Sequence, residues 1–159
     1  MWLSDAEQQA WRSLMLSTLL IDGALDRQLQ RDAGMPHAYY GILVALSEAP
    51  ERTMRMGDLA RGLYYSQSRI THAITSMERS GWVLRRNCPT DRRSQLVTMT
   101  AAGFATLRDA APAHVAEVRA AIFDRLSAEQ VDQLRIICDA IVAGFTSSSC
   151  EPSDSTPCP

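Results

Sequence analysis

The sequence contains no lysine, so all 16 of its basic residues are arginine, and its four cysteines form no Cys-x-x-Cys pair. Without such pairs, neither a zinc ribbon nor a thioredoxin-type motif is indicated. No apolar run approaches the roughly 20 residues that span a bilayer. The N-terminal segment also lacks the basic and then apolar order of a secretory signal. We therefore expect a cytoplasmic protein whose cysteines are free thiols.

Motifs of catalysis and of metal or cofactor binding are lacking as well. The three histidines, His37, His72 and His114, are scattered along the chain. There is no Gly-rich phosphate loop and no His-Glu-x-x-His pattern. We expect no enzyme activity, no cofactor and no metal site.

The distribution of charge is uneven, although the net charge of the chain is only −2. The segment from Arg55 to Arg93 holds eight arginines and three acidic residues, a net charge of +5. The rest of the chain holds eight arginines and fifteen acidic residues. A basic block within an acidic chain is typical of a protein that binds nucleic acid, but a solvated basic surface without a partner has the same composition.

The 159 residues, of which 46% are hydrophobic, suffice for one folded domain with a core. Ser4 and Glu7 form a capping box that predicts a long helix from about Asp5 to Asp32, closed by Gly34. A second helix is expected from Pro36 to about Ser47. Periodicity then predicts a short helix over 56–63, a helix capped by Ser66 and ending near Ser80, and two strands within 82–100.

The last part of the chain predicts two more helices. One begins at Thr100 and should be kinked or interrupted at Pro112. The other follows a capping box at Ser127, and its apolar residues repeat at heptad-like intervals that suit packing against another helix. Residues 147–159 are rich in Ser and Pro, which predicts a disordered tail.

Two short helices around a tight turn, followed by a hairpin, indicate a winged helix-turn-helix, whose second helix enters the major groove of DNA. With Ile70, Ala73, Ile74 and Met77 inward, the outward face of that helix is polar and free of acidic residues. Such a face can approach DNA and hydrogen-bond to base edges or phosphates. The expected contacts from this helix are Ser66, Gln67, Ser68, Arg69, Thr71, His72, Thr75 and Arg79.

The hairpin carries the remaining arginines of the basic block. Arginine on a narrow projection suits the minor groove, whose negative potential attracts it. Expected DNA contacts of the wing are therefore Arg85, Arg86, Arg92 and Arg93. We expect Asp91 to stiffen the tip by pairing with an arginine, because an acidic residue is repelled by DNA.

The order and spacing of several short motifs resemble the multiple antibiotic resistance regulator (MarR) family. These are Asp58-Leu59-Ala60, the run from Ser66 to Thr71, the run from Met77 to Arg86, Asp91-Arg92-Arg93 and Thr100-Ala101-Ala102-Gly103. The likeness covers nearly the whole chain. His72 departs from the pattern, because the family often has arginine there, and this leaves the base preference open.

The resemblance implies a dimeric bacterial transcription factor, most often a repressor, that binds a palindromic operator in double-stranded DNA. The arginine-only composition favours a high-GC bacterium. The fold class implied is mainly α, with six helices and a two-stranded wing. One domain would cover 1–146, with 36–99 as the DNA-binding lobe and 5–33 and 100–146 as dimerisation helices.

Many relatives release DNA when a small aromatic or anionic ligand occupies a cleft between the dimerisation helices and the DNA-binding lobe. Candidate residues for such a cleft are Trp11, Met15, His37, Tyr39 and Tyr40, although aromatic residues at helical spacing are more often ordinary packing. Two alternatives stay open. One is a winged helix that contacts protein instead of DNA, and the other is a thiol-responsive regulator that uses Cys88, which we expect to be exposed beside the wing.

Overall fold

The computed structural model describes residues 2–88 and 94–146, and the chain divides into two units, residues 1–117 and 118–159. The wing residues Asp91, Arg92 and Arg93 and the tail 147–159 lie outside the described residues. Within the described part there are six α-helices and one three-stranded sheet. The mainly α fold class is therefore confirmed. The expected boundaries between dimerisation helices and DNA-binding lobe stay a prediction.

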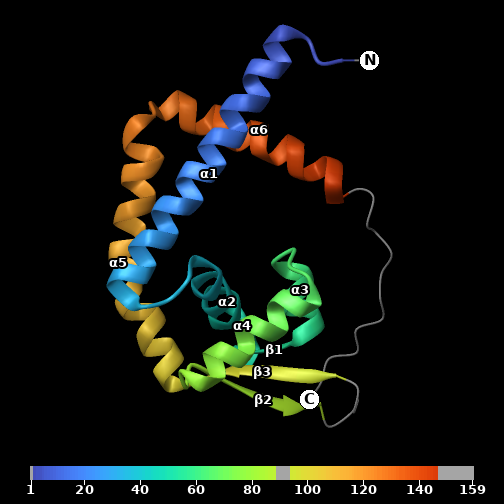
Figure 1. Ribbon diagram of the computed structural model, residues 1–159, viewed down its shortest axis with the longest axis vertical. Coiled ribbons are helices and arrows are strands. Elements are labelled where there is room, and N and C mark those ends of the chain that lie inside the picture. Colours follow the sequence, from blue (N-terminus) through green and yellow to red (C-terminus); the bar gives the residue numbers. More distant parts are fainter. Residues whose placement is uncertain (1, 89–93, 147–159) are drawn as a thin grey trace. The chain divides into compact units, whose positions relative to one another are not determined.

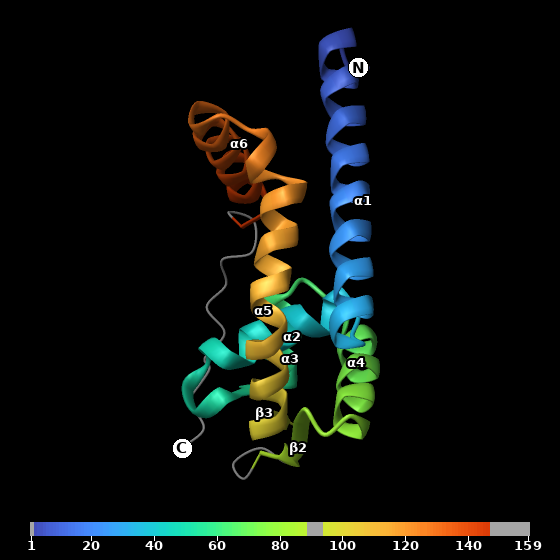
Figure 2. The same cartoon turned by 90° about the vertical axis from the view of Figure 1, so that its left-hand side faces the viewer.

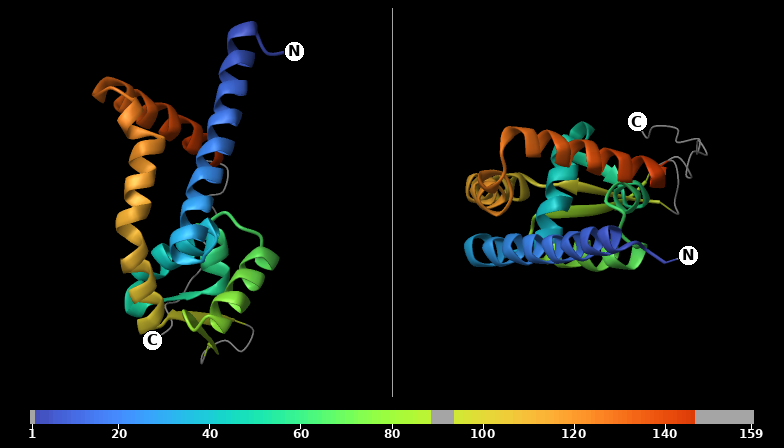
Figure 3. Two further views of the ribbon diagram at one scale, coloured as in Figure 1. Left: turned by 60° about the vertical axis from the view of Figure 1, so that its left-hand side comes forward. Right: turned by 90° about the horizontal axis from the view of Figure 1, so that it is seen from above.

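Helix α1 (Asp5–Ala33) has the termini that its capping residues predict. The Ser4 hydroxyl accepts a hydrogen bond from the N–H of Glu7, whose carboxylate binds back to the N–H of Ser4, and Gly34 ends the helix in the left-handed region at φ 63°. Leu25 and Leu29 near its end are buried, whereas its N-terminal half is exposed. Figures 2 and 3 show this half of α1 extending beyond α2 (His37–Glu48).

The next two helices form the helix-turn-helix. Helix α3 (Met56–Gly62) and helix α4 (Gln67–Arg79) are joined by a tight turn in which Tyr64 adopts a left-handed conformation at φ 54° and the N–H of Tyr65 bonds to the carbonyl of Ala60. Both helices and α2 bury apolar side chains in one core. The fully buried members of this core include Ile42, Leu43, Leu46, Leu59, Ile70, Ile74, Met77 and Val97.

The sheet contains one strand more than the sequence predicts. Strands β2 (Val83–Asn87) and β3 (Gln95–Met99) are the expected hairpin, and β1 (Thr53–Arg55) adds to the other edge of β3, so that the order is β1-β3-β2 and every pair is antiparallel. The side-chain hydroxyls of Thr53 and Thr98 lie 2.8 Å apart across the β1–β3 pair. Figure 1 shows the three strands beneath α3 and α4.

Helix α5 (Ala101–Ala121) includes Pro112 as one continuous helix, so Pro112 does not interrupt it, and the expected kink stays a prediction. A proline removes one backbone donor, and here the exposed helix tolerates the loss. The start of α5 is fixed on the end of α4: the hydroxyl of Thr100 donates to the carbonyl of Gly81 at 2.7 Å and accepts from the N–H of Gly103.

The second unit contains the end of α5, a short turn at Phe123–Arg125 and helix α6 (Ala128–Thr146). Ser127 and Gln130 form the expected capping box at the start of α6. No residue of α6 is buried within the single chain. Its exposed apolar residues include Leu134, Ile136, Ile137, Ile141, Val142 and Phe145.

Candidate nucleic-acid interface

The exposed residues of α4 are polar and include no acidic residue, as predicted, and the one acidic residue of the helix, Glu78, is about one quarter exposed. The helix buries Ile70, Ala73, Ile74 and Met77 in the core. Of the DNA contacts expected from α4 and its N-cap residue Ser66, Thr75 is half-buried and the others are exposed. The exposed residues are Ser66, Gln67, Ser68, Arg69, Thr71, His72 and Arg79. The structure thus brings these side chains onto one accessible face.

The start of α4 is held by two contacts that orient this face. The hydroxyl of Ser66 accepts a hydrogen bond from the N–H of Arg69 at 3.3 Å, as an N-cap residue does. The guanidinium of Arg69 lies 3.9 Å from the centre of the Tyr65 ring, a cation–π contact. Ser66 therefore positions the helix, and Tyr65 restrains the cation at its first turn.

Two threonines on α4 use their hydroxyl protons within the helix. The Thr71 hydroxyl donates to the carbonyl of Gln67 and the Thr75 hydroxyl donates to the carbonyl of Thr71, each at 2.8 Å. In this arrangement each hydroxyl oxygen remains an acceptor, and the methyl group is available for apolar contact. These two side chains suit an amino group or a thymine methyl group at a base edge better than a phosphate oxygen.

The wing is attached to α4 through Glu78 and Arg85. The Glu78 carboxylate accepts hydrogen bonds from the backbone N–H of Arg85 at 2.9 Å and from its Nε at 2.7 Å. The hydrogen bond from Arg85 lowers the pKa of Glu78. Both side chains are about one quarter exposed. Arg85, expected to contact DNA, therefore already has a partner within the protein, whereas Arg86 is exposed on the same strand.

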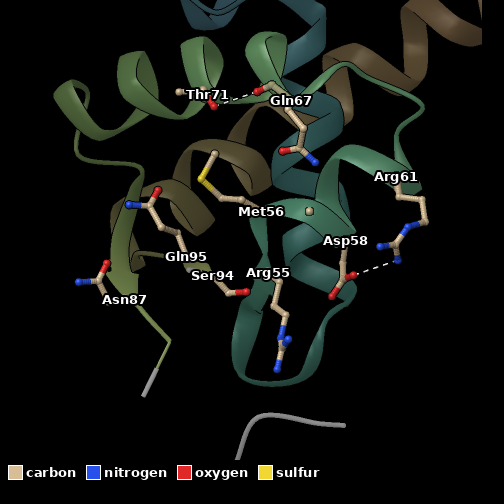
Figure 4. A pocket seen from close by; sticks show the side chains of 10 residues that line it. Arg55, Met56, Asp58, Arg61, Gln67, Thr71, Asn87, Ser94 and Gln95 are labelled. Atoms are coloured by element: carbon tan, nitrogen blue, oxygen red, sulfur yellow. Dashed lines mark hydrogen bonds and ion pairs between the residues drawn. The ribbon is translucent and has the colours of Figure 1, made fainter. Parts of the chain in front are cut away.

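A polar cavity of about 500 Å³ lies between α3, the start of α4 and the hairpin strands. Gln67 and Thr71 line it from α4, Asn87 and Gln95 from the strands, and Arg55 and Arg61 from the segment that contains α3 (Figure 4). Arg61 pairs with Asp58 at 3.0 Å. The cavity therefore adjoins the face of α4 described above.

Comparison with known proteins identifies this combination of helix-turn-helix, wing and flanking helices. The family model for the MarR family matches residues 33–94. The crystal structure of Sco3205, a MarR family transcriptional regulator from Streptomyces coelicolor in complex with DNA, is 44% identical, covers 99% of this chain and 96% of that one, and superposes with a TM-score of 0.87. The chain belongs to the MarR family of transcriptional regulators.

Two further similarities support this assignment. AbsC, a MarR family transcriptional regulator from Streptomyces coelicolor, is 39% identical over 92% of this chain and 99% of its own, with a TM-score of 0.85. The transcriptional activatory protein BadR of Rhodopseudomonas palustris is 42% identical over 71 residues, which span 44% of this chain and 41% of BadR. MarR family members are transcriptional regulators and not enzymes, in agreement with the sequence analysis.

The residues expected to line a ligand cleft fall into three groups in this MarR family chain. Trp11 and Met15 are exposed, at 53% and 41%, on the N-terminal half of α1. Tyr39 is half-buried and packs against the core. His37 and Tyr40, by contrast, lie beside His114 of α5, with ring centres 5.5 Å and 4.2 Å from it. A cleft that uses all five residues stays a prediction.

A chain of hydrogen bonds links this histidine cluster to α1. The side-chain nitrogen of Gln28 donates to Asp32, so its oxygen, which lies 3.2 Å from Nδ1 of His114, is the acceptor of the His114 proton. His37 faces Asp22 through Nδ1 at 3.0 Å and donates its backbone N–H to Asp26. Burial lowers the pKa of His114, and the nearby His37 lowers it further.

The expected exposure of Cys88 is wrong. Its side chain is 1% exposed, and its backbone N–H bonds to the carbonyl of Ser94 at the base of the wing. Burial removes the solvent access that a reactive thiolate needs, which weakens the alternative of a thiol-responsive regulator. Cys138 is exposed on α6 within the single chain.

Several residues of the site have no assignment in the sequence analysis. Arg55 and Arg61 contribute to the basic block, but their place beside Gln67 depends on how α3 packs against α4. Asn87 and Gln95 are paired across β2 and β3 and so reach the same cavity. Among the described residues, no cluster of three potential metal ligands occurs, and no helix combines the length and the apolar character that a membrane span requires.

Proposed function

We propose that this regulator binds double-stranded DNA in the cytoplasm as a homodimer and acts as a repressor at a pseudo-palindromic operator. The single observation that carries the proposal is the exposed, acid-free face of α4, held beside the wing by Glu78 and Arg85. The similarity to Sco3205, which was crystallised with DNA, supports the same reading. Each protomer would place α4 in a major groove, with half-sites about one helical turn apart.

The contacts divide into two classes. Gln67, Thr71 and Thr75 would meet base edges, because their side chains offer amide groups, acceptor oxygens and methyl groups. The residues that would contact phosphates or sugars are Ser68, Arg69, His72, Arg79, Arg86, Arg92 and Arg93. Ser66 and Arg85 would act indirectly, through the N-cap and through the ion pair with Glu78.

The homodimer is supported by exposed apolar residues on α1 and on α6, each helix considered separately. On α1, Trp11, Leu16, Leu19 and Leu20 are between 53% and 71% exposed. On α6, Ile136, Ile137, Val142 and Phe145 are between 54% and 74% exposed. Large apolar surfaces of this kind on a single chain mark an interface, and a second copy would cover them. A partner chain would then also complete any ligand cleft around Trp11 and Met15.

The direction of regulation and the effector need separate tests. The resemblance to the MarR family implies repression as the usual direction of regulation, whereas BadR is named as an activatory protein. An aromatic or anionic ligand bound near His37, Tyr39 and Tyr40 would release the DNA. A promoter–reporter assay with and without the gene measures the direction, and operator release by a panel of aromatic acids measures the effector.

The experiment that tests DNA binding is genomic footprinting with the purified full-length protein, followed by fluorescence anisotropy on the recovered sites. The proposal predicts protected sites with inverted symmetry. A variant of α4 such as Gln67→Ala should lose preference among these sites while its dimer remains intact. If the wild-type protein bound every duplex with the same affinity, the proposal of an operator-specific regulator would be contradicted.

A further inference from the structure

The polar cavity beside α4 has the chemistry of an anion site. Its lining offers hydrogen-bond donors from three directions: the guanidinium groups of Arg55 and Arg61, the amides of Gln67, Asn87 and Gln95, and the hydroxyl of Ser94. The lining contains two cationic side chains and one carboxylate, that of Asp58. The guanidinium of Arg61 and the amides of Gln67, Asn87 and Gln95 are donors that a phosphate group would accept from.

The position of the cavity relates it to DNA. Gln67 and Thr71 belong both to its wall and to the exposed face of α4, as Figure 4 shows. A helix that lies in a major groove has the sugar–phosphate backbone on either side of it. Arg61 of α3 and the donors on the hairpin strands flank α4, and so they lie where one of these two backbone strands would pass.

Within the cavity, Arg61 forms an ion pair with Asp58 in which a DNA phosphate could take the place of Asp58. Its guanidinium binds Asp58 three residues earlier on α3 at 3.0 Å, and the two side chains are 69% and 38% exposed. An exposed ion pair of this kind contributes little to stability. A DNA phosphate can therefore replace Asp58 as the partner of Arg61 at a small cost. Gly57 also lines the cavity, at a position where a Cβ atom would lie 3.9 Å from the side-chain nitrogen of Gln67.

We propose that the cavity receives a phosphodiester group of the DNA backbone and that Arg61 exchanges Asp58 for this phosphate when the duplex binds. This inference rests on the proposed function. Asp58 competes with DNA for Arg61, so that it lowers the affinity for every duplex, whatever the sequence, and thereby limits binding away from the operator.

The test compares four forms of the full-length protein: wild type, Arg61→Ala, Asp58→Asn and the double variant. Arg108→Ala is the matched control, because Arg108 forms a similarly exposed pair with Asp109 on α5, outside the cavity. Affinity is measured by fluorescence anisotropy on an operator duplex and on a duplex of unrelated sequence, over a salt series from about 50 mM to about 300 mM. Sedimentation confirms that each variant keeps the oligomeric state of the wild type.

Arg61→Ala should weaken binding to both duplexes and reduce the slope of log affinity against log salt by about one unit. Asp58→Asn should strengthen binding to both duplexes by about two- to fivefold. The gain from Asp58→Asn should disappear in the Arg61→Ala background, because no cation remains to be released. Arg108→Ala should leave both affinities and the slope unchanged.

Three results would overturn the inference. An unchanged salt slope for Arg61→Ala would show that Arg61 does not neutralise a phosphate. A gain from Asp58→Asn that persists in full without Arg61 would show long-range repulsion instead of exchange. A loss of affinity and of salt slope in Arg108→Ala equal to that in Arg61→Ala would show a general effect of charge instead of a site in the cavity. If the wild type binds neither duplex, the proposed function itself fails.

Discussion

Glu78, near the end of α4, and Arg85, in the middle of β2, are joined through both the backbone and the side chain of the arginine. The carboxylate accepts from the Arg85 N–H at 2.9 Å and from Nε at 2.7 Å. This pair connects the helix that would enter the major groove to the strand that begins the wing. It therefore couples the orientation of one DNA-binding element to that of the other.

Replacement of Glu78 by Gln should lower both stability and DNA affinity. The amide retains one acceptor but loses the charge that Arg85 binds, so we expect the free energy of unfolding to fall by about 1–2 kcal/mol. DNA affinity should fall severalfold because the wing is less well positioned. Urea denaturation and anisotropy measure the two effects. Arg86→Ala is the control, since loss of this exposed side chain should change the salt slope of DNA binding but not the stability. Equal stability of Glu78→Gln and wild type would contradict a structural role for the pair.

Glycine is required at position 103 by close packing. A Cβ atom there would lie 2.2 Å from the carbonyl oxygen of Trp82, a backbone atom that cannot easily move. Gly103→Ala should therefore reduce the free energy of unfolding by about 1–3 kcal/mol. Gly41→Ala in α2 is the matched control, because a Cβ at that position meets nothing within 4 Å, and this variant should be neutral or slightly stabilised. Chemical denaturation of the two variants tests the difference, and similar stabilities would be inconsistent with the close contact.

The stability of the protein should decrease as the pH falls below neutrality, because of His114. Burial lowers its pKa from the ordinary value of 6.5, so the unfolded chain binds a proton more readily than the folded one. The contribution of His114 is complete above pH 6.5 and is lost as the pH falls through the lowered pKa. The groups around it are Gln28 of α1, His37 and Tyr40 of α2, and Glu117 of α5.

The measurement is the free energy of unfolding at pH values between about 7.5 and 5 for wild type and His114→Gln. The variant should lose stability at every pH because of altered packing, but its stability should depend less steeply on pH than that of the wild type. Parallel curves for the two proteins would contradict a pKa of His114 that is lower in the folded chain than in the unfolded chain. The slope, and not the absolute stability, is the informative quantity.

Base preference should depend on Gln67 and Thr71. Gln67→Ala or Thr71→Ala should reduce the discrimination at particular base pairs by about 1–3 kcal/mol each, since each side chain would meet a base edge. Arg93→Ala should instead weaken binding to all sequences and reduce the salt slope by about one unit. Affinities for a set of single-base operator variants distinguish the two patterns. Uniform losses for Gln67→Ala would assign this side chain to the backbone.

Local features of the fold could be predicted from the sequence because they depend on residues close together in the chain. The Ser4–Glu7 capping box, the Gly34 terminus and the Ser66 cap are of this kind, and so is the exposed face of α4. Strand β1 was not predicted, because three residues are too few to show an alternating pattern. The pairing partner of β1 is β3, more than forty residues later.

Contacts between distant residues account for the remaining differences. Gln28 and His114 are 86 positions apart, and nothing in the local sequence indicates that these two polar side chains are buried together. Cys88 follows a strand whose residues are mostly exposed, so its burial under the wing depends on tertiary packing. Trp11 and Met15 repeat at helical spacing, but this periodicity does not distinguish a core within one chain from an interface between two.

The most direct test of the account is sedimentation velocity of the full-length protein with a footprinted duplex in dilute buffer. We expect a dimer in the absence of DNA and a complex of two chains per duplex, which dissociates as salt is added. A protein that remains monomeric, or a duplex whose sedimentation is unchanged by a large excess of protein at low salt, would contradict the claim that α4 and the wing together bind DNA from a dimer.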